Sequence, residues 1–327
     1  MMINGENRSV HKTVLLNETI EGLNLQGKTV VIDATFGGGG HSKAILEKYP
    51  NVKIIAFDQD KSAWEKAKSK FKDLEKRIFF VNANFRDLDS SLGKNFRKYA
   101  LGDIGQGTHF SQNSFPENLE QVDAIIFDLG LSSDQLENSG RGFSFMKDEP
   151  LLMTMKENPS LEDLTAQDIV NSWSEKSLAD IIYGYGEEKF SRKIAKGIVE
   201  ARQKTKIETT TDLVKVIEKS VPSSYKRGRL HFATKTFQAL RIAVNDELGA
   251  LQMGLEKGFE VLKNNGGRMA VISFHSLEDR IVKRFFKDKQ QKEEAKLINK
   301  KPITATEEEI KNNNRSRSAK LRVLEKN

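Results

Sequence analysis

Four consecutive glycines constrain the fold of this chain more than any other feature of its sequence. They are residues 37–40 of the stretch DATFGGGGHS, and they closely follow the apolar run Val30–Ile32. Glycines between a buried strand and a helix let the backbone approach a ligand closely, with N–H groups presented at the helix N-terminus. The pattern therefore predicts a ligand-binding strand, loop and helix. The alternative is a tight turn in which Asp33 caps the helix.

Short apolar runs alternate with helical patterns through the first 130 residues. β-branched runs separated by helices are typical of a parallel sheet covered on both faces. A polar segment at 101–118 interrupts the pattern, and we expect it to be a surface loop. The expected strands cover residues 29–33, 52–58, 78–81 and 122–129, and the expected helices cover 42–49 and 62–71.

From residue 135 the pattern indicates helices alone. Phe190, Ile194 and Ile198 recur at the spacing of one helix face. A long helix over 246–263 and a buried strand over 268–274 then follow. We therefore predict an α/β fold, a doubly wound sheet with an inserted all-helical domain. The expected parts are residues 1–136, 137–245 and 246–327.

Composition narrows the classes of function. The chain has no cysteine, which excludes disulfides, zinc–thiolate sites, iron–sulfur clusters and cysteine nucleophiles. No apolar stretch approaches the roughly 20 residues of a membrane span, so we expect a cytoplasmic protein without membrane contact. Residues 281–327 hold 14 Lys and Arg against 7 Asp and Glu, which accounts for the whole net charge of +7. This distribution predicts a polyanion partner; a solvated helical surface is the alternative.

The glycine loop favours one class of cofactor over two others. The spacing gives neither the third glycine of the dinucleotide fingerprint nor the Gly-Lys-Ser/Thr of a P-loop. Asp58 ends the second expected strand and suits the ribose hydroxyls of an adenosine, which NAD and S-adenosylmethionine share. Asp33 and the loop from Gly37 suit a cationic amino-acid ammonium better than a pyrophosphate, so we expect S-adenosylmethionine. Four polar residues end strands at the same expected edge of the sheet: Asp33, Asp58, Asn82 and Asp128.

Several longer motifs carry a resemblance to a known family. The motifs are HKTVLLNETI, DATFGGGGHS, FDLGLSSDQL, GRGFSFM, ATKTFQALRIAVNDEL, VISFHSLEDRIVK, KPITATEEEI and NNNRSRSAKLRV. In this order, from His11 to Val323, they resemble the bacterial 16S ribosomal RNA cytosine-N4 methyltransferases. The resemblance implies a class I methyltransferase sheet with an inserted helical substrate domain. It also implies S-adenosylmethionine as cofactor and the small ribosomal subunit, through a cytosine in the decoding region of its 16S rRNA, as substrate.

The resemblance also implies a set of cofactor contacts. By motif these are Gly39, Gly40, His41, Asp58, Phe85, Asp128 and Gln135, beside Asp33 and Gly37 of the same loop. The chain departs from the family pattern at Leu152, Thr154 and Lys156, where charged residues are usual, and at Phe232, where proline is usual.

Direct transfer to a cytosine amine needs a group that holds N4 in line with the methyl donor. We expect Asp128, Ser132 and Ser133, after the fourth strand, to perform this role; a helix N-cap is the alternative for the serines. Phe143 and Phe145 suit stacking on an extruded base or, equally, a place in the core.

Basic residues supply the expected contacts with phosphate. These are Arg141, Arg227, Arg229, Arg315 and Arg317, while Arg241 and Asn245 share a helix face and are weaker candidates for substrate contact. His275 follows the fifth strand and is interpreted as a satisfied core histidine rather than a site residue. A methyltransferase for another amine, an RNA-binding assembly protein and a dehydrogenase stay open as alternatives, as does a homodimer.

Overall fold

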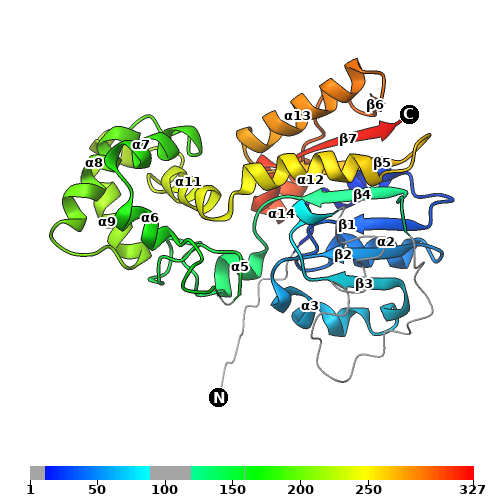
Figure 1. Cartoon of the computed structure of the whole chain (residues 1–327), viewed down its shortest axis with the longest axis horizontal. Helices are drawn as coiled ribbons and strands as arrows, with labels where there is room; N and C mark the ends of the chain where they lie inside the picture. Colours follow the sequence, from blue (N-terminus) through cyan, green and yellow to red (C-terminus); the bar gives the residue numbers. More distant parts are fainter. Residues whose placement is uncertain (1–11, 89–118, 158) are drawn as a thin grey trace. The chain divides into compact units, whose positions relative to one another are not determined.

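The computed structural model describes residues 12–88, 119–157 and 159–327, with the side chain of Ser133 excepted. The expected loop 101–118 lies outside these residues. The chain divides into two compact units (Figure 1): a sheet unit of residues 1–130 and 253–327, and a helical unit of residues 131–252. These boundaries differ by several residues from the expected ones. That the expected parts are independent domains stays a prediction.

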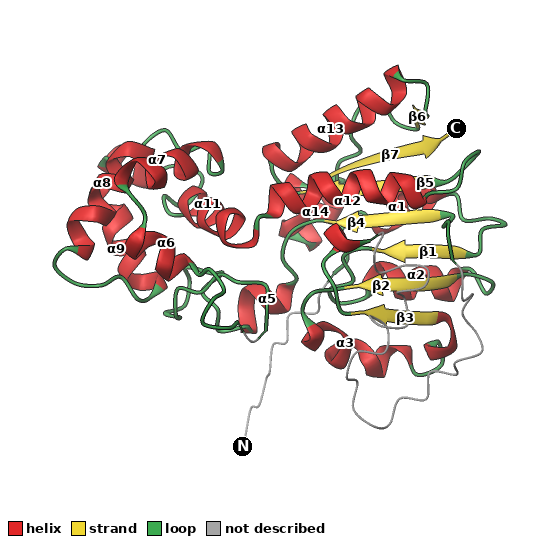
Figure 2. Ribbon diagram, in the orientation of Figure 1, coloured by secondary structure: helices red, strands yellow, loops and turns green. Residues whose placement is uncertain are grey.

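The sheet unit contains seven strands in the order β3-β2-β1-β4-β5-β7-β6 (Figure 2). β1 to β5 run parallel, and β7 pairs antiparallel with both β5 and β6. The five strands expected from the sequence are confirmed to within two residues at each end, whereas β6 and β7 were not predicted. The strands are β1 (Val30–Asp33), β2 (Lys53–Phe57), β3 (Ile78–Val81), β4 (Ala124–Asp128), β5 (Arg268–Ser273), β6 (Ala295–Leu297) and β7 (Lys320–Lys326).

Helices cover both faces of this sheet, as Figures 1 and 2 show. Alternate strand residues such as Val31, Ile54 and Ile126 share a buried cluster with α1, α2 and α3. The other alternation, Ile125 and Met269 among it, lies within contact distance of Gly258 on α12. The helices are α1 (Leu16–Leu23), α2 (Gly40–Lys48), α3 (Lys61–Ala67), α12 (Glu247–Val261), α13 (Ser276–Gln291) and α14 (Glu307–Asn312), with short 3₁₀ turns at Lys68–Phe71, Glu75–Arg77, Phe85–Asp87 and Asn314–Ser318.

The helical unit has a separate apolar core. Buried residues including Ile169, Leu178, Ile194, Leu213 and Leu240 form one cluster. Side-chain caps begin four of its helices. In the described part of this unit no strand forms, as expected, and a single bridge joins Pro150 to Thr209. Its helices are α5 (Ser133–Asn138), α6 (Ala166–Ser172), α7 (Glu175–Gly184), α8 (Ser191–Arg202), α9 (Thr210–Ser220), α10 (Ser223–Lys226) and α11 (Thr234–Asn245).

A lysine of the last strand, β7, caps the C-terminal end of a helix in the same unit. Lys326 of β7 donates through Nζ to the carbonyls of Phe259, Glu260 and Leu262 at 2.8, 3.3 and 2.9 Å. These carbonyls belong to the C-terminal end of α12, where backbone acceptors have no partner within the helix. A lysine at this place therefore satisfies the helix end and suits the negative end of the helix dipole. In the described parts of the chain, no helix has the length and apolar character that crossing a membrane requires.

Candidate cofactor site

Asp33 ends β1 and begins the glycine loop. Its carboxylate is 2% exposed and accepts a hydrogen bond from Ser42 Oγ at 2.6 Å. The backbone N–H of Thr35 donates to its other oxygen at 3.3 Å. Burial raises the pKa of Asp33 to about 6, and the two hydrogen bonds moderate that rise. The first turn of α2 therefore fixes this carboxylate, and the environment would favour a cationic partner for it.

Two of the four glycines are required by the protein itself. Gly39 has a φ of 72°, and a Cβ there would lie 2.7 Å from the ring of Phe36. A Cβ at Gly40 would overlap the hydroxyl of Thr13. Close approach to a ligand, which the sequence suggested as the reason for these glycines, is therefore not needed to explain either one. Thr13 had no assigned role in the sequence, because nothing in the spacing indicates that residues 13 and 40 meet.

Asp58 follows β2 and holds the loop from the other side. Its Oδ2 accepts from the N–H of Gly37 at 2.8 Å, and Oδ1 accepts from Asp60 at 2.9 Å. Gly37 has a φ of 51°, which favours glycine. Asn82 donates through Nδ2 to the backbone carbonyl of Asp58 at 2.9 Å. Burial raises the pKa of Asp58 to about 7, so the carboxyl is poised near neutrality.

Asp128 ends β4 next to the glycine loop. Its N–H donates to Thr35 Oγ1 at 2.6 Å, and its Oδ2 lies 3.5 Å from Nδ1 of the buried His41. Its other oxygen, Oδ1, is buried and has no hydrogen-bond partner among the described residues. Burial, with the charges of Asp33 and Glu278, raises the pKa of Asp128 well above its usual value. An unpaired buried acceptor is costly, so Oδ1 is suited to a donor from a bound molecule.

Phe85 follows β3 and is packed against the sheet. Its ring meets Phe127 edge-on, with centroids 5.6 Å apart, and a Cβ at Gly254 would lie 2.6 Å from it. The structure thus gathers Asp33, Asp58 and Asp128 with the loop at the carboxyl ends of β1, β2 and β4. This edge is where ligands bind in open α/β sheets.

The sequence model of the MraW methylase family matches residues 8–327. The chain belongs to that family. The family is that of the 16S rRNA cytosine-N4 methyltransferases, so the resemblance seen in the motifs is confirmed. The chain is accordingly an S-adenosylmethionine-dependent methyltransferase of class I fold, and S-adenosylmethionine is its cofactor. The buried carboxylate of Asp33 and that of Asp58 fit this cofactor, whose amino-acid ammonium is a cation and whose ribose hydroxyls are donors.

Solved structures with a similar arrangement share little sequence with this MraW-family chain. An rRNA methylase from Streptococcus thermophilus is 11% identical, with a TM-score of 0.42, over 97% of this chain and 99% of that one. A Streptococcus mutans protein in complex with SAH is 13% identical, also with a TM-score of 0.42, over 94% of this chain and 96% of that one. The family assignment comes from the sequence match.

Two residues expected at the site lie in the helical unit, where they form a helix cap. Ser132 Oγ accepts from the N–H of Gln135, and Gln135 Oε1 accepts from the N–H of Ser132, both at 3.1 Å. The N-cap alternative for Ser132 is therefore confirmed. Its catalytic role and that of Ser133, whose side chain is not described, stay predictions, as does cofactor contact by Gln135.

Four of the expected substrate residues perform structural work in the helical unit. Arg141 is 7% exposed and donates to the carbonyls of Met155 and Lys156, both at 2.9 Å. Phe143 is buried in the core of the unit. Arg241 forms a bidentate pair with Glu247. Asn245 accepts from the N–H of Met155 and donates to Met153, which fixes the same loop that carries the departures from the family pattern.

Part of the basic C-terminal segment is paired within the chain. Arg322 and Lys320 of β7 both contact Asp279, at 2.8 and 3.3 Å. Lys296 pairs with Glu325, and Lys326 caps α12. The surplus of positive charge is therefore a weaker sign of a polyanion partner than the sequence indicated. Of the expected phosphate contacts, Arg315 is half-buried while Arg227, Arg229 and Arg317 are exposed.

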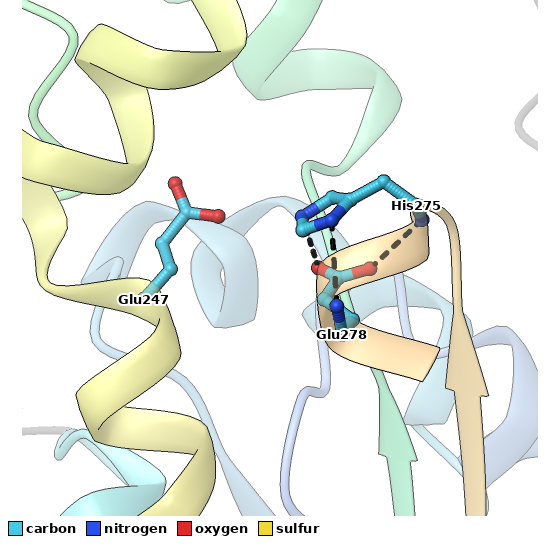
Figure 3. A group of neighbouring side chains, drawn as sticks. All are labelled: Glu247, His275 and Glu278. Atoms are coloured by element: carbon cyan, nitrogen blue, oxygen red, sulfur yellow. Dashed lines mark hydrogen bonds and ion pairs between the residues drawn. The ribbon is translucent and has the colours of Figure 1, made fainter. Parts of the chain in front are cut away.

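His275 is the N-cap of α13 (Figure 3). Its Nδ1 accepts from the N–H of Glu278 at 3.4 Å, and Glu278 Oε2 accepts from the N–H of His275 at 3.2 Å. The ring nitrogen Nε2 lies 3.2 Å from Glu278 Oε1. His275 is half-buried and its Nε2 forms no hydrogen bond with the described residues, so the structure does not confirm the expected satisfied core histidine and shows a helix cap instead.

Proposed function

We propose that this methyltransferase transfers one methyl group to the N4 amine of a cytosine in the decoding region of 16S rRNA. The proposal rests on Asp128, the last residue of β4, which lies at the cofactor edge of the sheet. Its buried Oδ1 has no hydrogen-bond partner among the described residues. An amine N–H is the donor that this acceptor suits. Membership of the MraW methylase family supports the acceptor class.

Each carboxylate has a role in this reaction. Asp58 suits the ribose hydroxyls of the cofactor, and Asp33 suits its ammonium. The cofactor supplies an electrophilic methyl group, so the chain has no nucleophile to activate. Asp128 accepts a hydrogen bond from the N4 amine, which turns the nitrogen lone pair toward the methyl, and its carboxylate takes the proton that N4 loses as the new N–C bond forms. Holding two reactants in such a geometry contributes about 7–11 kcal/mol in favourable cases.

Two further features support an amine as the acceptor. Methylation at C5 of a pyrimidine ordinarily uses a cysteine nucleophile, and the chain has none. The target base has to leave its stack to reach the edge of a sheet, as bases do in enzymes that modify them. We propose that the helical unit, with its exposed Arg227 and Arg229, contacts the RNA around that base.

Methyl transfer from labelled S-adenosylmethionine to small ribosomal subunits that lack the modification tests this function. We expect label as N4-methylcytosine with the native chain and with Asp73→Ala, an exposed acidic residue of the same unit. Asp58→Ala should lose cofactor binding and transfer together. Asp128→Asn should keep cofactor binding within a few-fold and lose transfer by about 10²-fold or more, since the amide orients an N–H toward the amine.

Other outcomes would favour the alternatives. Tight cofactor binding without label in ribosomal RNA would contradict the proposed acceptor and favour an amine of another RNA, DNA or protein. RNA binding that Asp128→Ala leaves unchanged, without transfer to any acceptor, would favour an assembly protein that has kept the cofactor site.

A further inference from the structure

Three aromatic rings of the helical unit form a stack near its surface. The rings of Phe145 and His231 are parallel within 13°, with centroids 4.5 Å apart. His231 and Phe232 are 4.2 Å apart at 30°. We call Phe145, His231 and Phe232 the ring stack. Its middle ring, His231, is exposed, whereas both phenylalanines are half-buried.

The ring stack is anchored in the core of the unit. Phe145 meets Phe237 edge-on, with centroids 5.3 Å apart, and Phe237 is 4% exposed. The N–H of Ala233 donates to Nδ1 of His231 at 3.3 Å, so the proton of the neutral ring is on Nε2. Burial lowers the pKa of His231, which favours this neutral form. The ring stack therefore offers aromatic faces and one N–H donor, that of His231 Nε2.

Exposed cations lie beside the ring stack on the same loop. Arg227 and Arg229 are exposed and have no ion pair among the described residues. Since consecutive Cα atoms are 3.8 Å apart, their Cα atoms lie at most about 15 and 8 Å from that of His231. Leu230, between them and the stack, is 49% exposed, and Met146, next to Phe145, is 79% exposed. Exposed apolar and cationic residues thus adjoin the ring stack in the sequence.

We propose that the ring stack and the two arginines bind an unpaired stretch of RNA, with one base stacked on the rings and adjacent phosphates on Arg227 and Arg229. Stacking platforms flanked by cations are the usual chemistry of single-strand recognition, because every base has an aromatic face and every linkage a charge. A protein partner of acidic character would meet the arginines but would leave the parallel rings without a matching group. The inference rests on RNA being the substrate class and deepens the proposed function.

Binding of a short unstructured RNA to the full chain tests the ring stack without requiring catalysis. The probe is a 12-nucleotide single strand with a fluorescent end label and one 2-aminopurine. We expect His231→Ala and Phe232→Leu each to weaken binding by about 5- to 150-fold and to reverse the quenching of 2-aminopurine. Tyr183→Ala, which removes an exposed ring of α7 outside the stack, is the matched control and should bind as the native chain does.

Substitution of the two arginines should change a different quantity, the salt dependence of RNA binding. Arg227→Gln and Arg229→Gln should each reduce the slope of log affinity against log salt concentration by about 0.7, the value for one phosphate contact with a single strand. They should leave the quenching of 2-aminopurine in place. Thermal unfolding of every variant should match the native chain, because the changed side chains are exposed or lie at the edge of the core.

Three results would decide the matter. Native affinity in His231→Ala and Phe232→Leu would overturn the proposal. If His231→Ala and Phe232→Leu lose binding to intact small subunits but bind the RNA strand as the native chain does, the proposal is also overturned. The surface would then be assigned to a protein partner. Ring-dependent RNA binding by a chain that methylates no ribosomal cytosine would uphold the ring stack while contradicting the proposed function.

Discussion

Gly39 and Gly40 show how single residues of the loop are determined from inside the protein. Phe36 and Phe71 occupy the space beside Gly39, and Thr13 occupies the space beside Gly40. The loop is thus shaped by packing before any cofactor arrives. Such preorganisation reduces the ordering that binding would otherwise require.

Replacement of Gly40 by alanine tests this packing. We expect Gly40→Ala to lower the free energy of unfolding by about 1–3 kcal/mol, as overpacking does, and to weaken cofactor binding by moving the loop. Thr13→Ala should restore most of both in the double variant. Differential scanning calorimetry and titration with S-adenosylmethionine measure the two effects. If Thr13→Ala restores neither, the space at Gly40 serves the ligand after all.

We expect the carboxylates of Asp33 and Asp58 to make cofactor binding depend on pH. Burial raises the pKa of Asp33 to about 6 and that of Asp58 to about 7 in the free protein. A cationic cofactor favours the ionised carboxylates, so binding should release protons near neutrality. We expect the dissociation constant of S-adenosylmethionine to fall as pH rises from 5.5 to 8. Calorimetry in buffers of different ionisation enthalpy counts the released protons.

The same pKa values set the stability of the free protein. Between the unfolded pKa near 4 and the folded pKa near 7, the folded Asp58 holds more protons than the unfolded one. The free energy of unfolding should therefore decrease as pH rises through this window. Asp58→Asn should flatten both this decrease and the binding profile. A binding constant unchanged between pH 5.5 and 8 would contradict the role given to these carboxylates.

Some site residues were predictable from sequence and others were not. Asp33, Asp58 and Asp128 follow apolar runs, and parallel strands bring their ends to one edge. Thr35, in contrast, contacts Asp128 across 93 residues, a pairing that no local pattern contains. Arg141 and Asn245 suggested substrate contact by charge and polarity, but their hydrogen bonds go to backbone carbonyls and N–H groups that only the folded loop presents.

At the scale of elements, β7 combines three tasks that the sequence did not indicate. It pairs with β5 and β6, places Arg322 against Asp279 and ends α12 through Lys326. The segment 320–326 contains only seven residues with three cations. Charge suggested a tail, whereas the alternation of Leu321 and Val323 with polar residues was too short to favour a strand.

Removal of the lysine amine tests the cap on α12. We expect Lys326→Met to lower the free energy of unfolding by about 1–2 kcal/mol, because carbonyls at the helix end lose a charged donor. Urea unfolding followed by circular dichroism measures the change. Lys292→Met, at an exposed pair with Asp288, should leave it nearly unchanged. Equal effects of the two substitutions would mean that Lys326 acts only through surface charge.

On the scale of the whole molecule, the sheet unit is assembled from two separated stretches of chain. Residues 1–130 supply β1 to β4, and residues 253–327 supply β5, β7 and β6. The helical unit is continuous in sequence and lies between them. The sequence indicated this interruption correctly, because the loss of strand patterns after residue 135 and their return at 268 mark it.

This arrangement has a consequence for synthesis. Synthesis of a chain starts at its N-terminus. The continuous helical unit is therefore complete in sequence while the sheet still lacks its final three strands. β5 has to pair with a β4 edge that has waited through about half of translation, and β7 then pairs with β5. While this apolar edge is exposed, the chain is most prone to misassembly. Pairing of β7, the last strand, and capping of α12 by its lysine then complete the sheet unit and end this exposure.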